Sequence, residues 1–161
     1  MARVYVSVGS NIDPAENIRS AMALFKRCYP RFELSCVYES EAVGFEGDNF
    51  YNFVIGFDTD HGVDRVARLL RDIEDRHARD RSGPRFSART IDLDLLLYDD
   101  LVAPEMNIPR DEITKNAFVL RPLAELAPTT RHPVSQQCFA ALWQAFDRTR
   151  QGLWRIDFDW S

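Results

Sequence analysis

The sequence contains no apolar run of membrane-spanning length, no internal repeat and no low-complexity tract. A membrane-spanning helix requires about 20 consecutive apolar residues, so we expect no membrane association. The first residues, from Met1 to Tyr5, lack the basic and apolar regions of a secretory signal peptide. We therefore expect a cytoplasmic protein.

Cysteine is scarce as well. Only Cys28, Cys36 and Cys138 are present, and their spacing matches neither a zinc site nor a redox pair. Because the number is odd and the positions are far apart, a disulfide framework is excluded. We expect reduced thiols, most of them buried.

The chain has no excess of positive charge: 20 Lys and Arg stand against 25 Asp and Glu, and the net charge is −5. Nucleic-acid-binding domains are usually basic, so we expect no nucleic-acid partner. The hydrophobic fraction of 45% and the charged fraction of 28% are typical of a globular protein. The 161 residues predict a single domain, 1–161, which we expect to act as a monomer because its largest apolar positions fall on predicted core faces.

Two carboxylates interrupt residues 89–98, a stretch of apolar and β-branched residues without Gly or Pro that is typical of a strand. Side chains alternate along a strand, so Asp92 and Asp94 are expected on one face, roughly 7 Å apart, with Leu96 and Tyr98 beyond them. Ile91, Leu93, Leu95 and Leu97 are expected on the other face. Hard cations such as Mg²⁺ offset the cost of burying carboxylates, whereas an isolated Asp-x-Asp more often pairs with arginines.

A cluster of arginines precedes these aspartates: Arg79, Arg81, Arg85 and Arg89 surround the loop signal Ser82-Gly83-Pro84. Guanidinium groups match phosphate oxygens bidentately. An arginine loop beside a carboxylate metal site is what phosphoryl transfer requires. Each arginine alone is consistent with a solvated surface charge, which is the better interpretation for Arg65, Arg68 and Arg71 on the preceding helix.

The order of the expected elements predicts an α+β fold with a ferredoxin-like βαββαβ core, a mainly antiparallel sheet and helices on both faces. Asp13, Pro14 and Glu16 form a helix-start pattern, with Asp13 as N-cap. The expected core strands cover residues 4–8, 32–42, 53–58 and 89–98, and the two core helices run from residue 14 to before Pro30 and from 63 to about 77. After them we expect a helix at 118–126, an apolar helical stripe from Phe139 to Phe146 and a last strand at 153–158.

Four motifs resemble the family of 6-hydroxymethyl-7,8-dihydropterin pyrophosphokinase, a folate-pathway enzyme, in their order and spacing. They are Val8-Gly9-Ser10-Asn11, Phe50-Tyr51-Asn52, Arg79-x-Arg81 with Phe86 and the run from Arg89 to Asp94, and Ala117-Phe118-Val119-Leu120-Arg121-Pro122-Leu123. The resemblance covers nearly the whole chain. It implies transfer of pyrophosphate from ATP to the hydroxymethyl group of a reduced pterin, with release of AMP.

The resemblance also implies roles for individual residues. Asp92 and Asp94 would hold two Mg²⁺ ions, and Arg79 and Arg81 would grip the triphosphate as catalytic arginines. Further ATP contacts would come from Arg71, Glu74, Arg89 and Arg110. For the pterin, Phe86 and Phe118 would stack on the ring, Asn52 would bind its edge, and Asp92, Ser40 and Val43 would lie beside it. A Phe in the run around Phe118 is also consistent with core packing, as is Phe50.

The chain departs from the family pattern at Glu41, at Ser87-Ala88, at Arg110 and at Ala117, where Pro, Gly-Pro, His and Arg are common. These departures bear on the identity of the pterin and favour, as an alternative, a paralogue acting on a different reduced pterin. Two further alternatives are a non-catalytic pterin- or nucleotide-binding regulator and another Mg²⁺-dependent nucleotidyl or sugar transferase, although the latter would not explain Asn52, Phe86 and Phe118. Loss of Asp92 or Asp94 would mark the regulator, and both are present.

Overall fold

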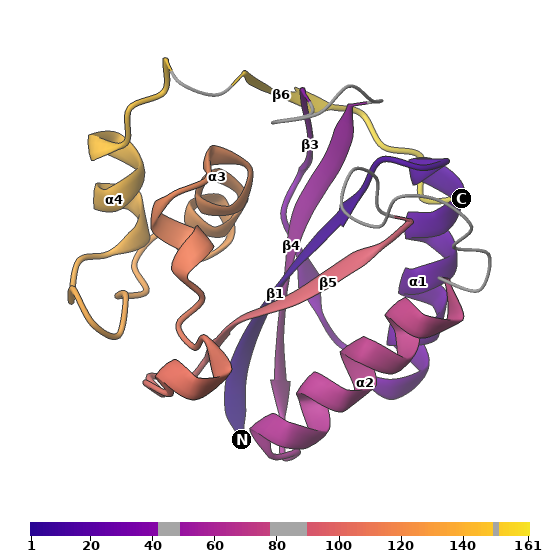
Figure 1. The fold of residues 1–161 in the computed structure, drawn as a ribbon, viewed down its shortest axis with the longest axis horizontal. Helices are drawn as coiled ribbons and strands as arrows, with labels where there is room; N and C mark the ends of the chain where they lie inside the picture. Colours follow the sequence, from indigo (N-terminus) through magenta and orange to yellow (C-terminus); the bar gives the residue numbers. More distant parts are fainter. Residues whose placement is uncertain (42–48, 78–89, 150–151) are drawn as a thin grey trace.

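The computed structural model describes residues 1–41, 49–77, 90–149 and 152–161. Its strands form one antiparallel sheet in the order β5-β1-β4-β3-β6, and β2 also pairs with β4 (Figure 1). The strands are β1 (Ala2–Ser10), β2 (Glu33–Leu34), β3 (Val37–Ser40), β4 (Phe50–Thr59), β5 (Asp92–Tyr98) and β6 (Leu153–Ile156), and the helices are α1 (Pro14–Cys28), α2 (Val63–Arg76), α3 (Ala117–Leu126) and α4 (Phe139–Ala145).

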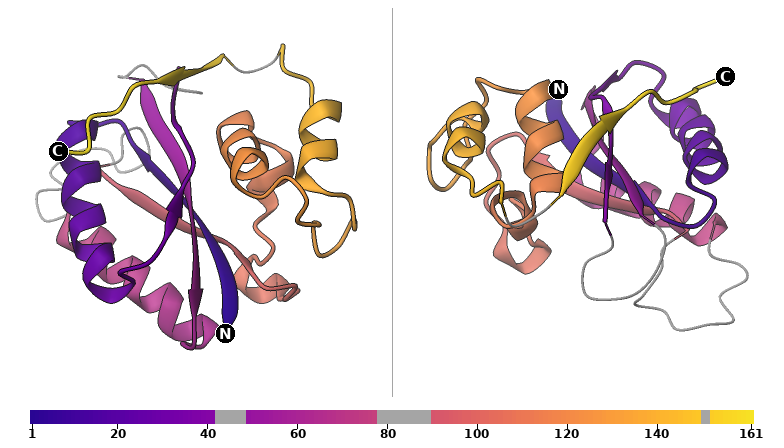
Figure 2. Two further views of the ribbon diagram at one scale, coloured as in Figure 1. Left: turned by 180° about the vertical axis from the view of Figure 1, so that it is seen from behind. Right: turned by 90° about the horizontal axis from the view of Figure 1, so that it is seen from above.

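Helices cover both faces of this sheet (Figure 2). On one face, α1 and α2 bury Ile18, Phe25 and Leu70 against apolar side chains of β1, β4 and β5. On the other face, α3 and α4 bury Leu120 and Phe139 against Tyr5, Val54 and Leu97. The predicted α+β, ferredoxin-like fold is confirmed, because β1, α1, β3, β4, α2 and β5 follow one another in the βαββαβ order and every strand pair is antiparallel.

The start of α1 differs from the prediction in one respect. Asp13 is the N-cap residue, but its side chain makes no capping hydrogen bond. A capping side chain requires extended backbone, whereas Asp13 is left-handed with φ 40°. The Asn17 side-chain amide instead donates to the Ile12 carbonyl at 2.6 Å.

Strand β5 contains a bulge that overturns part of the predicted alternation. Val6 pairs with Leu95 and Tyr5 pairs with Leu97, so Leu96 is an extra residue. Leu96 and Leu97 therefore both pack against α3 and α4, and Tyr98 turns to the α1 and α2 side. The faces predicted for Leu97 and Tyr98 were wrong, because the pairing with β1 and not local sequence sets the bulge.

The strand predicted over residues 32–42 is broken into β2 and β3. At the break, Ser35 is bound twice to Val54: the Val54 N–H donates to the Ser35 hydroxyl at 2.9 Å, and the Ser35 N–H donates to the Val54 carbonyl at 3.0 Å. The last predicted strand exists as β6, which pairs with β3.

The cysteines are free, as predicted, but Cys28 is exposed and Cys36 and Cys138 are half-buried, so the expectation that most are buried was wrong. Within the described ranges, no helix combines the length and the apolar character that crossing a bilayer requires. The loop between Pro104 and Pro109 is closed by pairing of Ala103 with Ile108 and contains the 3-10 helix η1 (Pro104–Met106), and η2 (Asp111–Thr114) follows.

Candidate active site

Asp92 and Asp94 point to the α3 side of β5, as alternation predicted, and both are half-buried. Leu93 and Leu95 pack into the opposite core. Across the ladder with β1, Asp92 pairs with Gly9. The hydroxyl of Ser10 donates to the Thr90 carbonyl at 2.6 Å, so the end of β1 holds the chain at the point where it enters β5.

Glu74 of α2 adds a third carboxyl group to this end of β5. Its Oε2 accepts the backbone N–H of Leu93 at 2.9 Å, between the two aspartates. Burial, together with the charges of Asp92, Asp94 and Asp75, raises its pKa to about 7, against the lowering effect of the hydrogen bond. The negative charge collected here favours a cation.

No cluster of three or more His, Cys, Asp or Glu ligands suited to a metal exists among the residues that the structure describes. Within the described ranges, the carboxylates predicted to hold a metal are Asp92 and Asp94. Mg²⁺ typically binds in this way, through one or two carboxylates, with water and substrate phosphates completing its coordination. The two residues fit a magnesium ion that arrives with a nucleotide and do not form a complete protein cage.

Arg110 lies directly against the carboxylate of Asp94. Its Nη2 is 3.3 Å from Asp94 Oδ1 and 3.1 Å from Glu112 Oε1. Its backbone N–H donates to the carbonyl of the bulge residue Leu96 at 3.0 Å. These contacts place a half-buried guanidinium group beside the proposed metal ligand.

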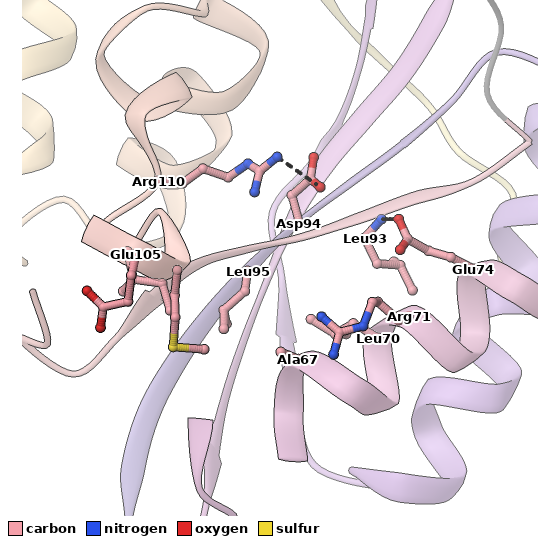
Figure 3. A pocket seen from close by; sticks show the side chains of 11 residues that line it. Ala67, Leu70, Arg71, Glu74, Leu93, Asp94, Leu95, Glu105 and Arg110 are labelled. Atoms are coloured by element: carbon pink, nitrogen blue, oxygen red, sulfur yellow. Dashed lines mark hydrogen bonds and ion pairs between the residues drawn. The ribbon is translucent and has the colours of Figure 1, made fainter. Parts of the chain in front are cut away.

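A pocket of about 350 Å³ lies around this edge of the sheet, between α2, β5 and η1 (Figure 3). Arg71 and Glu74 enter from α2, and Arg110 extends from the opposite side toward Asp94. The structure thus brings together three of the residues predicted to contact ATP with one predicted metal ligand. The pocket lining also includes Ala67, Leu70, Leu93, Leu95, Glu105, Met106 and Ile108.

Sequence reasoning missed Glu105 and Met106 as lining residues. They belong to η1, in the loop between Pro104 and Pro109, where hydrophobic periodicity is lost. The only available signal was that the loop follows closely on the aspartate strand.

A second group of predicted residues meets on the α3 face of the sheet, on strands β3 and β4. Asn52 is buried on β4, and its Nδ2 donates to the Ser40 hydroxyl at 3.4 Å. Gly9 of β1 pairs with Asn52 on one side and with Asp92 on the other. A Cβ atom on Gly9 would lie 2.7 Å from Asn52 Oδ1. The absence of a side chain at residue 9 therefore leaves room for Asn52 beside the aspartate strand.

Two aromatic residues belong to the same face. Phe118, near the start of α3, is half-buried against the α3 and α4 core. Phe50 precedes Asn52 by two residues on β4 and so shares its face. Phe50 is half-buried, and the period of two was the signal that could have placed it beside Asn52.

The remaining predicted site residues, Val43, Arg79, Arg81, Phe86 and Arg89, lie outside the described residues. Their assignments stay predictions. The predicted site residues that the structure describes are Ser40, Asn52, Arg71, Glu74, Asp92, Asp94, Arg110 and Phe118.

Comparison with known proteins identifies the family to which this arrangement belongs. Residues 5–128 match the model of 7,8-dihydro-6-hydroxymethylpterin-pyrophosphokinase (HPPK). The chain belongs to the HPPK family. Pyrophosphate transfer in folate biosynthesis, the function predicted from the sequence, is therefore confirmed at the level of the family.

Individual relatives agree with this assignment. The 2-amino-4-hydroxy-6-hydroxymethyldihydropteridine pyrophosphokinase of Pseudomonas aeruginosa is 38% identical over 138 residues, 81% of this chain and 84% of the relative. The enzyme of the same name from Aquifex aeolicus is 34% identical over 138 residues, 83% of this chain and 86% of the relative.

Solved structures show the same fold. A Plasmodium falciparum HPPK-DHPS triple mutant with pteroate matches 89% of this chain with a TM-score of 0.67 at 12% identity. The match covers 43% of that longer chain, so this HPPK chain spans less than half of the solved protein.

Proposed function

We propose that this chain transfers an intact pyrophosphoryl group from ATP to the hydroxymethyl oxygen of 6-hydroxymethyl-7,8-dihydropterin, releasing AMP. A bond forms between this oxygen and the β-phosphorus while the bridge between the α- and β-phosphates breaks. The bonding electron pair leaves with AMP, and the hydroxyl proton is released to water. The observation that carries the proposal is the position of the aspartates, between the pocket at the sheet edge and the Asn52 face.

The pocket is the proposed nucleotide site. Arg71 and Arg110 offer forked donors to phosphate or ribose oxygens from opposite walls. Leu70, Met106 and Ile108 offer an apolar lining for a base. The resemblance assigns Arg79 and Arg81 to the triphosphate and Arg89 to the nucleotide or its phosphates, and these three arginines would add positive charge to the nucleotide site.

The Asn52 face is the proposed pterin site. A reduced pterin presents a flat ring and an edge of alternating donors and acceptors, which an amide can match. Asn52, held by Ser40, supplies that amide. Phe50 and Phe118 offer ring faces, with Phe86 as the predicted further partner. The pairing order Asn52, Gly9, Asp92 directs the pterin substituent toward the aspartates.

We propose Mg²⁺, in two ions, as the metal held by Asp92 and Asp94. When bound, these ions would supply the positive charge that neutralises the phosphates and lowers the pKa of the attacking hydroxyl. Asp94, which is paired with Arg110 in this structure, would hold the metal, and the Arg110 guanidinium would then be available to the nucleotide.

The test is a product assay with ATP, Mg²⁺ and 6-hydroxymethyl-7,8-dihydropterin. AMP that appears in step with pterin consumption, and that disappears with EDTA, supports the proposal. ADP would indicate an ordinary kinase. Tight binding of pterin or nucleotide without turnover would indicate a regulator.

A second candidate is a paralogue acting on a different reduced pterin. Glu41 favours the paralogue. At this position the family usually has Pro, whereas this chain has an exposed carboxylate directly after Ser40. Assays of several reduced pterins side by side, with AMP as the readout, separate the two candidates by the ratio of kcat/KM values.

We also propose that the protein acts as a monomer. The exposed large apolar residues of the described chain are scattered over the sequence: Met1, Ile12, Val102, Val134, Trp154 and Trp160. Light scattering at assay concentration tests this, and a dimer mass would contradict it.

A further inference from the structure

The last nine residues of the chain lie beyond the part that matches the HPPK family model, which ends at residue 128. They form β6 and then an extended tail that runs from the sheet toward α1 (Figures 1 and 2). Both parts of this segment contact strands that carry proposed pterin-binding residues.

Strand β6 pairs with β3 along its whole length, including the pair Ser40 and Leu153. Without β6, β3 would be the edge of the sheet. Edge strands have unpaired backbone groups and are less firmly held. Ser40, the hydrogen-bond partner of Asn52, therefore lies on an inner strand because of the C-terminal segment.

The tail then packs aromatic rings on the back of β4. The ring centroids of Phe158 and Tyr51 are 6.3 Å apart, and those of Trp160 and Phe53 are 5.4 Å apart, both in edge-to-face geometry. Tyr51 and Phe53 alternate with Asn52, so the tail and the pterin site occupy opposite faces of one short stretch of strand.

Several contacts hold this tail in place. The rings of Phe158 and Trp160 are in contact with each other, with centroids 4.4 Å apart. Arg19 of α1 donates from Nη1 to the Asp159 carbonyl at 2.7 Å, and its guanidinium lies 6.0 Å from the Phe158 ring centroid. The tail is thus tied to both the helix and the strand.

We infer that the aromatic tail, Phe158 and Trp160, positions the start of β4 so that Asn52 meets the pterin. This inference rests on the proposed function, since it assumes that Asn52 binds the pterin edge. Removing a ring from the back of β4 lets the strand shift, and Asn52 then loses its alignment with Ser40 and Gly9. The nucleotide pocket contains no residue of β4, so its affinity for ATP is unaffected.

The experiment compares Trp160→Ala with Trp154→Ala. The two tryptophans are matched, with exposed fractions of 41% and 40%, but only Trp160 contacts Phe53 among the ring pairs of the described chain. Calorimetry gives the Kd for 6-hydroxymethyl-7,8-dihydropterin, and steady-state assays give kcat and the KM for each substrate. Trp160→Ala is expected to raise the pterin Kd and KM about fivefold, the size expected for loss of an aromatic pair. The ATP KM, and every constant of Trp154→Ala, stay within about twofold of wild type.

Two further variants separate positioning from general stability. Trp160→Phe keeps an aromatic ring against Phe53 and is expected to restore pterin affinity. Arg19→Ala releases the tail without touching the core and is expected to weaken pterin binding selectively, even if Trp160→Ala does not fold. A lower melting temperature with an unchanged pterin Kd, or equal losses for both substrates, would overturn the inference. If wild-type protein neither binds the pterin nor releases AMP, the proposed function itself fails.

Discussion

The carboxylate of Glu74 on α2 accepts the backbone N–H of Leu93 on β5, with 2.9 Å between the two atoms. This bond ties the helix to the strand between the two proposed metal ligands. It also places a third acidic group where Asp92 and Asp94 already oppose its ionisation. The site therefore stores electrostatic repulsion that a bound cation would relieve.

The first prediction concerns the pH dependence of stability. The pKa of Glu74 rises from 4.5 to about 7 on folding. Below pH 4.5 the carboxyl is protonated in both states; as pH rises toward 7, the unfolded chain ionises first and stability is lost. Urea unfolding without Mg²⁺ measures the free energy of unfolding at each pH. Between pH 4.5 and 8 this free energy should fall by about 2 kcal/mol less in Glu74→Gln than in wild type, a value reduced for partial screening by solvent.

The matched control for this prediction is Glu105→Gln, which alters an exposed glutamate of the same pocket. Its stability profile should follow wild type. If the free energy of unfolding of Glu74→Gln falls over this pH range as much as that of wild type and of Glu105→Gln, then Glu74 is not the group that titrates.

The second prediction concerns the aspartates. Asp94→Asn should lower AMP formation about a thousandfold, the scale of losing a principal electrostatic contact, while circular dichroism stays unchanged. Asp100→Asn, at an exposed position just past the end of β5, serves as control and should keep full activity. A folded Asp94→Asn protein with near-normal turnover would contradict the assignment of Asp94 as a metal ligand.

The third prediction concerns Arg110, whose Nη2 lies 3.3 Å from Asp94 Oδ1. Arg110→Ala removes a charge-assisted donor from the nucleotide pocket and should raise the KM for ATP about tenfold without changing the pterin Kd. Arg110→His introduces the residue usual in the family and should recover most of the affinity. A change in pterin binding instead would move Arg110 out of the nucleotide site.

The fourth prediction concerns Gly9, where a Cβ atom would lie 2.7 Å from Asn52 Oδ1. Gly9→Ala should displace the Asn52 amide, weaken pterin binding about tenfold and lower stability by about 1–3 kcal/mol. Gly62→Ala is the control, because a Cβ there meets no atom within 4 Å. Equal pterin affinity in both variants would show that Asn52 does not need this space.

The arrangement of the site was predictable where it depends on periodicity. The period of two placed Asp92 and Asp94 on one face and Leu93 and Leu95 on the other, since each strand buries a continuous apolar row. It failed beyond the bulge residue Leu96, at Leu97 and Tyr98, because a bulge is set by the register with a neighbouring strand, which leaves no mark in the local sequence.

Residues in loops were predictable only through the family resemblance. Nothing in the pattern around Arg110 indicates that its guanidinium reaches Asp94, because that contact depends on how the loop after β5 folds back. Glu105 and Met106, in the same loop region, were indicated neither by the pattern nor by the resemblance. The packing of Phe158 and Trp160 on β4 could not be predicted from the sequence pattern either, because it joins residues about a hundred positions apart.

The position of β5 at the end of the sheet order has a consequence for solubility. An open edge strand invites pairing with another copy of the chain, and natural sheets prevent this with charged side chains and bulges. Strand β5 carries both, in Asp92 and Asp94 and in the bulge at Leu96. The acidic pair proposed to bind metal thus also discourages self-association, so neutralising both aspartates at once should make the protein prone to aggregate through this edge.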